Sequence, residues 1–152
     1  NLEAVNTVSK EYADKYLVGD YTGTDVNNAY LEMNYDLFGA EYALKNHYGD
    51  VYIKAQEANA VGIDYDSYYQ YYIATKDLNA KDENGNSVTG LKKERVMEAI
   101  ESLDLSAGQK AFLFAESGYK LNSSMKSQLW NYIESLSLSA SEKQAIYDEL
   151  TE

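Results

Sequence analysis

The stretch IESLDLSAGQKAFLF, residues 100–114, returns in outline as IESLSLSASEKQAIY, residues 133–147. Aligned at this offset of 33, residues 100–116 and 133–149 share nine identities in 17 positions. A period near 33 residues is typical of helix–turn–helix repeats. The sequence therefore predicts two tandem copies of one helical unit in the C-terminal half of the chain.

Apolar residues at helical spacing precede the turn in each copy. They are Val96, Ile100 and Leu103 in the first copy and Leu129, Ile133 and Leu136 in the second. Leu105 and Leu138 come two positions after the last of these, and we expect them to fill the corner between two helices. The leucines at 103, 105, 136 and 138 are therefore predicted to be structural joints.

A serine that begins the second helix follows each corner. Ser106 stands three residues before Gln109, and Ser139 stands three residues before Glu142, which is the spacing of a capping box. Second helices are therefore predicted to begin at about 106 and 139. Gly118 is a suitable left-handed residue to end the first of them.

The N-terminal half is rich in tyrosine, with 13 of the 16 tyrosines lying between positions 12 and 72. Helices are predicted over 2–17, from Thr24 or Asp25 to about 48, from about 51 to 60, and from Asp64 to 77. Gly39 falls inside the second of these, where it costs about 1 kcal/mol relative to alanine and allows close packing. The polar segment 79–90, NAKDENGNSVTG, is a predicted linker.

Together these patterns predict an all-α fold of about seven to eight short helices. We divide the chain into a tyrosine-rich helical region at 1–78, a polar linker at 79–90 and two helical-hairpin repeats at 91–152. Proline is absent, which suits a continuous helical array. The chain begins at Asn1, so we interpret it as part of a longer protein or as a processed product.

Composition narrows the function classes. The formal net charge of −12 opposes direct binding to nucleic acid and to anionic membranes. Cysteine is absent and His47 is the single histidine, so thiol chemistry and multi-histidine zinc sites are excluded. Asp82, Asn84 and Asn86 alternate as calcium ligands do, but the glycine and glutamate of a calcium loop are out of place. We expect no metal, no cofactor, no membrane span and no catalytic residue, with His47 a helix C-terminal residue.

The segment DYDSYYQYY, residues 64–72, carries the candidate binding residues. Tyr65, Tyr68, Tyr69 and Tyr72 share one face of the predicted helix, while Tyr71 points elsewhere. Tyrosine combines a large apolar area with a polar tip and is enriched at interfaces. Three interpretations stay open: a core built from tyrosine, a protein–protein interface, or a ligand site.

Residues 81–119 combine a K-D-x-N-G turn, a lysine-rich helix start and an I-x-S-L-x-L-S joint followed by Q-K. This pattern resembles segments of large structural proteins of phages and prophages of Gram-positive bacteria, such as tail-associated, tape-measure-like or minor capsid proteins. Ala99 departs from the pattern, which has an aromatic residue there; Tyr132 supplies one in the second copy. The resemblance covers roughly the last 70 residues. It implies an assembly role in a virion or in the bacterial cytoplasm, with no catalytic residues.

Three functions are therefore compared. The first is a structural module that contacts copies of itself or other subunits of a large assembly. The second is a peptide- or glycan-binding module with a tyrosine-lined groove. The third is a hydrolase with two carboxylates, which would require two buried acids with raised pKa.

Overall fold

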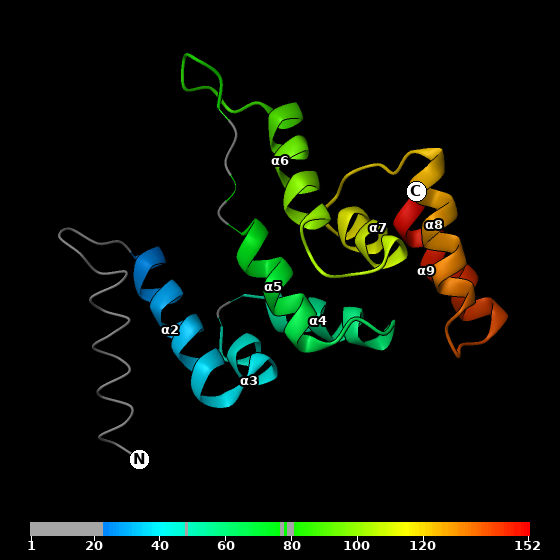
Figure 1. The fold of residues 1–152 in the computed structure, drawn as a ribbon, viewed down its shortest axis with the longest axis horizontal. Coiled ribbons are helices and arrows are strands. Elements are labelled where there is room, and N and C mark those ends of the chain that lie inside the picture. The colour runs from blue at the N-terminus through cyan, green and yellow to red at the C-terminus, as the bar shows by residue number, and fades with distance from the viewer. Residues whose placement is uncertain (1–22, 48, 77, 79–80) are drawn as a thin grey trace. The chain divides into compact units, whose positions relative to one another are not determined.

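The computed structural model describes residues 23–47, 49–76, 78 and 81–152, and the regular structure in this part is helical (Figure 1). A single bridge pairing joins Lys81 and Ser87. The predicted all-α fold of about eight helices is thereby confirmed. The predicted helix at 2–17 lies outside the described residues. The described helices are α2 (Gly23–Phe38), α3 (Ala40–Lys45), α4 (Val51–Ala60), α5 (Tyr65–Thr75), α6 (Thr89–Glu101), α7 (Ala107–Glu116), α8 (Ser123–Glu134) and α9 (Ala140–Thr151).

The chain forms two compact units, Asn1–Asn59 and Ala60–Glu152. In the described part, the first holds α2, α3 and nearly all of α4, and the second holds α5 to α9. The tyrosine-rich helix α5 thus belongs to the same unit as the two repeats. The division by composition, into 1–78 and 91–152, separates it from them. The segment 79–90 lies inside the second unit.

The long helix predicted from Thr24 or Asp25 to about 48 is wrong, because Gly39 interrupts it. Helix α2 already begins at Gly23 and ends at Phe38, and Gly39 adopts φ +93° and ψ 174° before α3 begins. This backbone region is open essentially to glycine alone. A Cβ on Gly39 would meet nothing within 4 Å, so this glycine serves the turn and not close packing.

The first unit has a core of small and medium side chains. Ala29 and Met33 pack together on α2, with the half-buried Leu37 against them. Ala43 and Leu44 of α3 are fully buried. Helices α2 and α3 pack against each other.

In the second unit, the two joints share a serine cap and a lysine contact. Ser106 and Ser139 are the N-caps of α7 and α9, and each side chain accepts from the backbone N–H three residues on, at 3.2 Å. Lys110 Nζ donates to the Glu101 carbonyl at 2.8 Å, and Lys143 Nζ donates to the Glu134 carbonyl at 2.9 Å.

The end of the first helix is repeated as well. The Ser102 hydroxyl donates to the Ala99 carbonyl at 2.7 Å, and the Ser135 hydroxyl donates to the Tyr132 carbonyl at 2.6 Å. Each equivalent bond is displaced by the same 33 residues as the sequence repeat. The predicted helix–turn–helix joints and their start positions are confirmed.

The second cap differs from the expected box. The Gln109 side chain accepts from the Ser106 N–H at 3.1 Å, so the first joint has a complete capping box. In the second joint the Glu142 carboxylate accepts from the Ser139 hydroxyl at 2.9 Å instead of from its N–H. A bond from a hydroxyl to a carboxylate is charge-assisted, and here it takes the place of the bond between Glu142 and the Ser139 N–H that a capping box requires.

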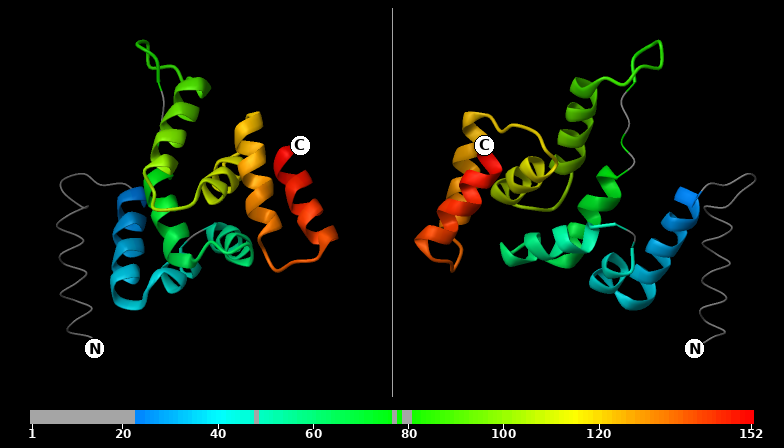
Figure 2. Two further views of the ribbon diagram at one scale, coloured as in Figure 1. Left: turned by 45° about the vertical axis from the view of Figure 1, so that its right-hand side comes forward. Right: turned by 180° about the vertical axis from the view of Figure 1, so that it is seen from behind.

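The two second helices are buried to different degrees. Residues 111–114 of α7 are all buried, whereas α9 has no buried residue. Ile146 and Tyr147, the counterparts of Leu113 and Phe114, are half-buried. Figures 1 and 2 show α9 lying antiparallel beside α8, and the Tyr147 ring meets Trp130 edge-on at 5.1 Å between centroids. The second repeat is therefore packed less deeply than the first.

The predicted joint leucines are less enclosed than expected. Leu103, Leu105, Leu136 and Leu138 are all half-buried. The deeply buried positions of the two repeats lie one turn earlier, at Ile100 and Ile133, which are 1% and 0% exposed. Leu103 and Leu105 thus border the corner, and Ile100 fills the core beneath it.

Candidate functional site

The tyrosine segment forms helix α5, and three of its five tyrosines belong to the core. Asp64 is the N-cap, and its carboxylate accepts from the Ser67 N–H at 2.7 Å, as the sequence predicts. Tyr68 and Tyr69 are each 5% exposed, while Tyr65 and Tyr72 are half-buried. Two of the four candidate binding residues therefore offer little surface to a partner.

Tyr71, which the periodicity places away from the tyrosine face, is buried too. Its hydroxyl and that of Ser117 are 2.6 Å apart, and its ring lies 5.3 Å from that of Tyr68. Ser117 in turn donates to the Leu113 carbonyl at 2.9 Å. Burial raises the pKa of Tyr71 above its ordinary value of 10.0, against the opposing effect of the Ser117 hydrogen bond. Tyr71 thus ties α5 to the end of α7.

A second polar contact involves Tyr132, at a position where the two repeats differ. Tyr132 occupies the position of Ala99, and its hydroxyl donates to the Val61 carbonyl. Gln109 Nε2 lies 3.4 Å from the Tyr132 hydroxyl and 3.4 Å from the Gly62 carbonyl. The difference between Ala99 and Tyr132 at equivalent repeat positions is the sequence signal for this contact. The acceptor, in the turn before α5, could not be predicted from sequence spacing.

A glycine makes room for the Tyr132 side chain. A Cβ on Gly108 would lie 2.2 Å from Tyr132 Cβ and 2.9 Å from the Gln128 carbonyl. Position 108 therefore excludes any side chain as long as α7 and α8 stay at this distance. In the second copy the counterpart is Ser141, which is exposed.

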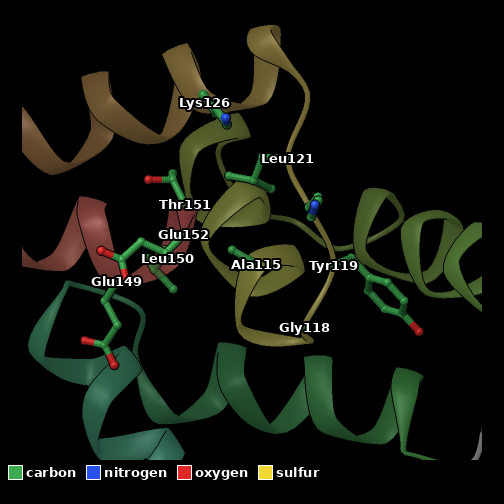
Figure 3. A pocket seen from close by; sticks show the side chains of 10 residues that line it. Ala115, Gly118, Tyr119, Leu121, Lys126, Glu149, Leu150, Thr151 and Glu152 are labelled. Atoms are coloured by element: carbon green, nitrogen blue, oxygen red, sulfur yellow. The ribbon is translucent and has the colours of Figure 1, made fainter.

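A cavity of about 470 Å³ lies near the ends of α7 and α9 (Figure 3). Apolar groups of Ala115, Leu121 and Leu150 face it together with charged residues of both signs. Figure 3 shows Lys126 and Glu149 at opposite ends of the group, with the Tyr119 ring turned away from the other residues. The lining residues are Ala115, Gly118, Tyr119, Lys120, Leu121, Lys126, Glu149, Leu150, Thr151 and Glu152.

The loop at 82–86 is a closed turn. Asp82 Oδ1 accepts from the backbone N–H groups of Asn84 and Asn86, both at 2.9 Å. The Asp82 N–H donates to the Asn86 carbonyl at 2.8 Å, and Gly85 adopts φ +82°. The Asp82 side chain thus closes the turn, and these bonds use the backbone of Asn84 and Asn86.

The remaining candidate residues from the sequence do not form a metal site in the described part of the chain. Among the described residues, no group of three or more His, Asp or Glu side chains could hold a metal ion, and no polar or charged residue is buried. His47 follows the end of α3 and is half-buried. No helix in the described part of the chain is long and apolar enough to cross a membrane.

Large apolar side chains are exposed mainly in the first unit. Tyr30, Phe38, Tyr42 and Ile53 are 59, 55, 44 and 59% exposed. Phe38 and Tyr42 form a pair with ring centroids 4.5 Å apart and planes tilted by 47°. We call this pair the aromatic patch. In the described part of the chain, it combines two exposed aromatic rings in direct contact.

Comparisons with protein families, curated proteins and solved structures gave no match to this chain. The resemblance to phage structural proteins stays a prediction from the sequence. Function is therefore inferred from the geometry described above.

Proposed function

We propose that this chain is a non-enzymatic structural and protein-interaction module of a large phage-derived or bacterial assembly protein. The observation that carries the proposal is the exposure of the aromatic patch. Aromatic side chains are enriched at protein interfaces because they bury a large area on association. Phe38 and Tyr42 leave about half of their area in water.

The repeated joint supports the same proposal. Two helical repeats with equivalent caps and lysine contacts lie in one compact unit, as in helical-repeat proteins that serve as binding platforms. The alternative, a groove lined by the tyrosines of α5, finds less support because Tyr68, Tyr69 and Tyr71 are buried.

Site-specific photo-crosslinking tests this proposal. A photoreactive phenylalanine analogue is placed at position 38 and, as a matched control, at Ile73, an exposed residue of the second unit. In cells that make the parent assembly, position 38 is expected to give one defined product with another subunit or with a second copy. Equal product patterns at 38 and 73, or no product at 38, would contradict an interaction role for this surface.

A further inference from the structure

The aromatic patch lies at the break between α2 and α3. Phe38 is the last residue of α2, and Tyr42 lies in the first turns of α3. Gly39, with φ +93°, turns the chain between them, so that two rings from different helices meet. The patch therefore consists of two rings in contact on either side of the turn.

Two acidic residues lie close to the patch in the sequence. Asp36 lies in the last turn of α2 and Glu41 in the first turn of α3, and both are exposed. The last turn of α2 has no basic residue, so the partial negative charge of this helix end is not offset within the helix. Lys45 is the basic residue of α3.

Acidic residues also outnumber basic residues in the segment 29–59 of the first unit. Between residues 29 and 59 the chain has five acidic residues and two lysines. The acidic residues are Glu32, Asp36, Glu41, Asp50 and Glu57, and the lysines are Lys45 and Lys54. A partner that covers the aromatic patch must therefore bring positive charge with its apolar groups.

We propose that the aromatic patch binds a basic, amphipathic helical segment of another subunit, and this inference rests on the proposed function. The apolar side chains of that segment cover Phe38 and Tyr42. Its lysine or arginine side chains lie against the ring faces and pair with Asp36 and Glu41. A second copy of this chain carries a net charge of −12, so repulsion between like charges opposes its approach as a whole.

Fluorescence anisotropy with synthetic peptides tests the inference on the full chain. The probe is a short amphipathic helical peptide of leucine and lysine, and its twin replaces every lysine with glutamate. The lysine peptide is expected to bind at least about tenfold more tightly than its twin, and more weakly as salt is added.

Variants of the patch separate its contribution from general attraction to an acidic protein. Phe38→Ser and Tyr42→Ser keep the net charge and are each expected to weaken binding of the lysine peptide by about tenfold, or 1.4 kcal/mol. Phe38→Leu, which keeps an apolar side chain without a ring, is expected to weaken it by less. The control Ile73→Ser, at an exposed apolar residue of the other unit, is expected to leave binding unchanged.

Equal binding of both peptides, or unchanged binding by both serine variants, would overturn the inference. Far-ultraviolet circular dichroism of each variant verifies that the helices are intact. A crosslinked product at position 38 without peptide binding would leave the proposed function standing and remove only the basic partner. Absence of both the crosslinked product and peptide binding would contradict the proposed function and the basic partner together.

Discussion

The Tyr132 hydroxyl donates a hydrogen bond to the main-chain carbonyl of Val61, 71 positions earlier in the chain. The donor belongs to the second repeat, and the acceptor lies in the turn before α5. Val61 is 4% exposed, so its carbonyl has little access to water. This contact, with Gln109 beside it, makes the turn at 61–63 part of the folded repeat unit.

Removing the Tyr132 hydroxyl should destabilise the second unit. Tyr132→Phe keeps the ring and leaves the Val61 carbonyl without its donor, at an expected cost of about 1–3 kcal/mol. Tyr119→Phe is the matched control, because that half-buried ring stacks on Phe114 and its hydroxyl has no hydrogen-bond partner in the described structure. Urea denaturation measures both. Equal midpoints for the two variants would show that the Tyr132 hydroxyl contributes nothing.

The close approach of α7 and α8 at Gly108 gives a second prediction. Gly108→Ala places a Cβ 2.2 Å from that of Tyr132, and the helices must separate, at an expected cost of about 1–3 kcal/mol or more. Gly90→Ala, in α6 with nothing within 4 Å of its added Cβ, should instead stabilise by roughly 0.5 kcal/mol. Thermal melting should therefore shift in opposite directions. If the Gly108→Ala and Gly90→Ala proteins had the same melting temperature, the packing of α7 against α8 at Gly108 would be contradicted.

The repeated serine caps give a third prediction. Ser106→Ala and Ser139→Ala each remove the acceptor for an N–H in the first turn of a helix, and each should cost about 1 kcal/mol. Ser124→Ala is the control, since this exposed serine lies within the first turn of α8 and the cap there is Asn122. Urea midpoints unchanged in both cap variants would mean that these serines do not stabilise their helices.

Features that depend on interactions between residues close in the sequence could be predicted, and features that depend on distant residues could not. Caps, turns and helical faces are local, so Ser106, Asp64 and Gly118 could be assigned from neighbours three or four residues away. The break at Gly39 was missed, because a glycine with positive φ and a glycine inside a helix have the same letter and similar neighbours.

The candidate site was harder to predict because it depends on tertiary packing. Whether a tyrosine in α5 is core or surface is decided by the elements that cover it, such as Ser117, which lies 46 positions from Tyr71. Helical spacing placed Tyr68 and Tyr69 on one face with Tyr65, but it could not tell that the face is largely covered. Exposure of Phe38 and Tyr42 likewise depends on which elements pack around them, and helical spacing does not specify this.

Tyr71 should make the protein more sensitive to alkali. Because burial raises its folded-state pKa above 10.0, the unfolded chain loses this proton first as pH rises. The stability contributed by the protonated hydroxyl is complete below pH 10 and is lost as pH rises through the folded-state pKa. Tyr71→Phe should therefore reduce the loss of stability between neutral pH and pH 11, measured by urea denaturation at each pH. An identical pH dependence in both proteins would show that Tyr71 ionises equally in the folded and unfolded states.

The last prediction concerns which segment folds independently. Helix α5 packs against α6, Tyr71 bonds Ser117, and Gln109 contacts the Gly62 carbonyl, so the repeats depend on residues before the 79–90 linker. A fragment of residues 60–152 should unfold in one cooperative transition. A fragment of residues 91–152 lacks these contacts, and its loss of at least about 2 kcal/mol should lower Tm by about 10 °C. If the two fragments melt at the same temperature, the repeats form a domain on their own and the unit boundary belongs at the linker.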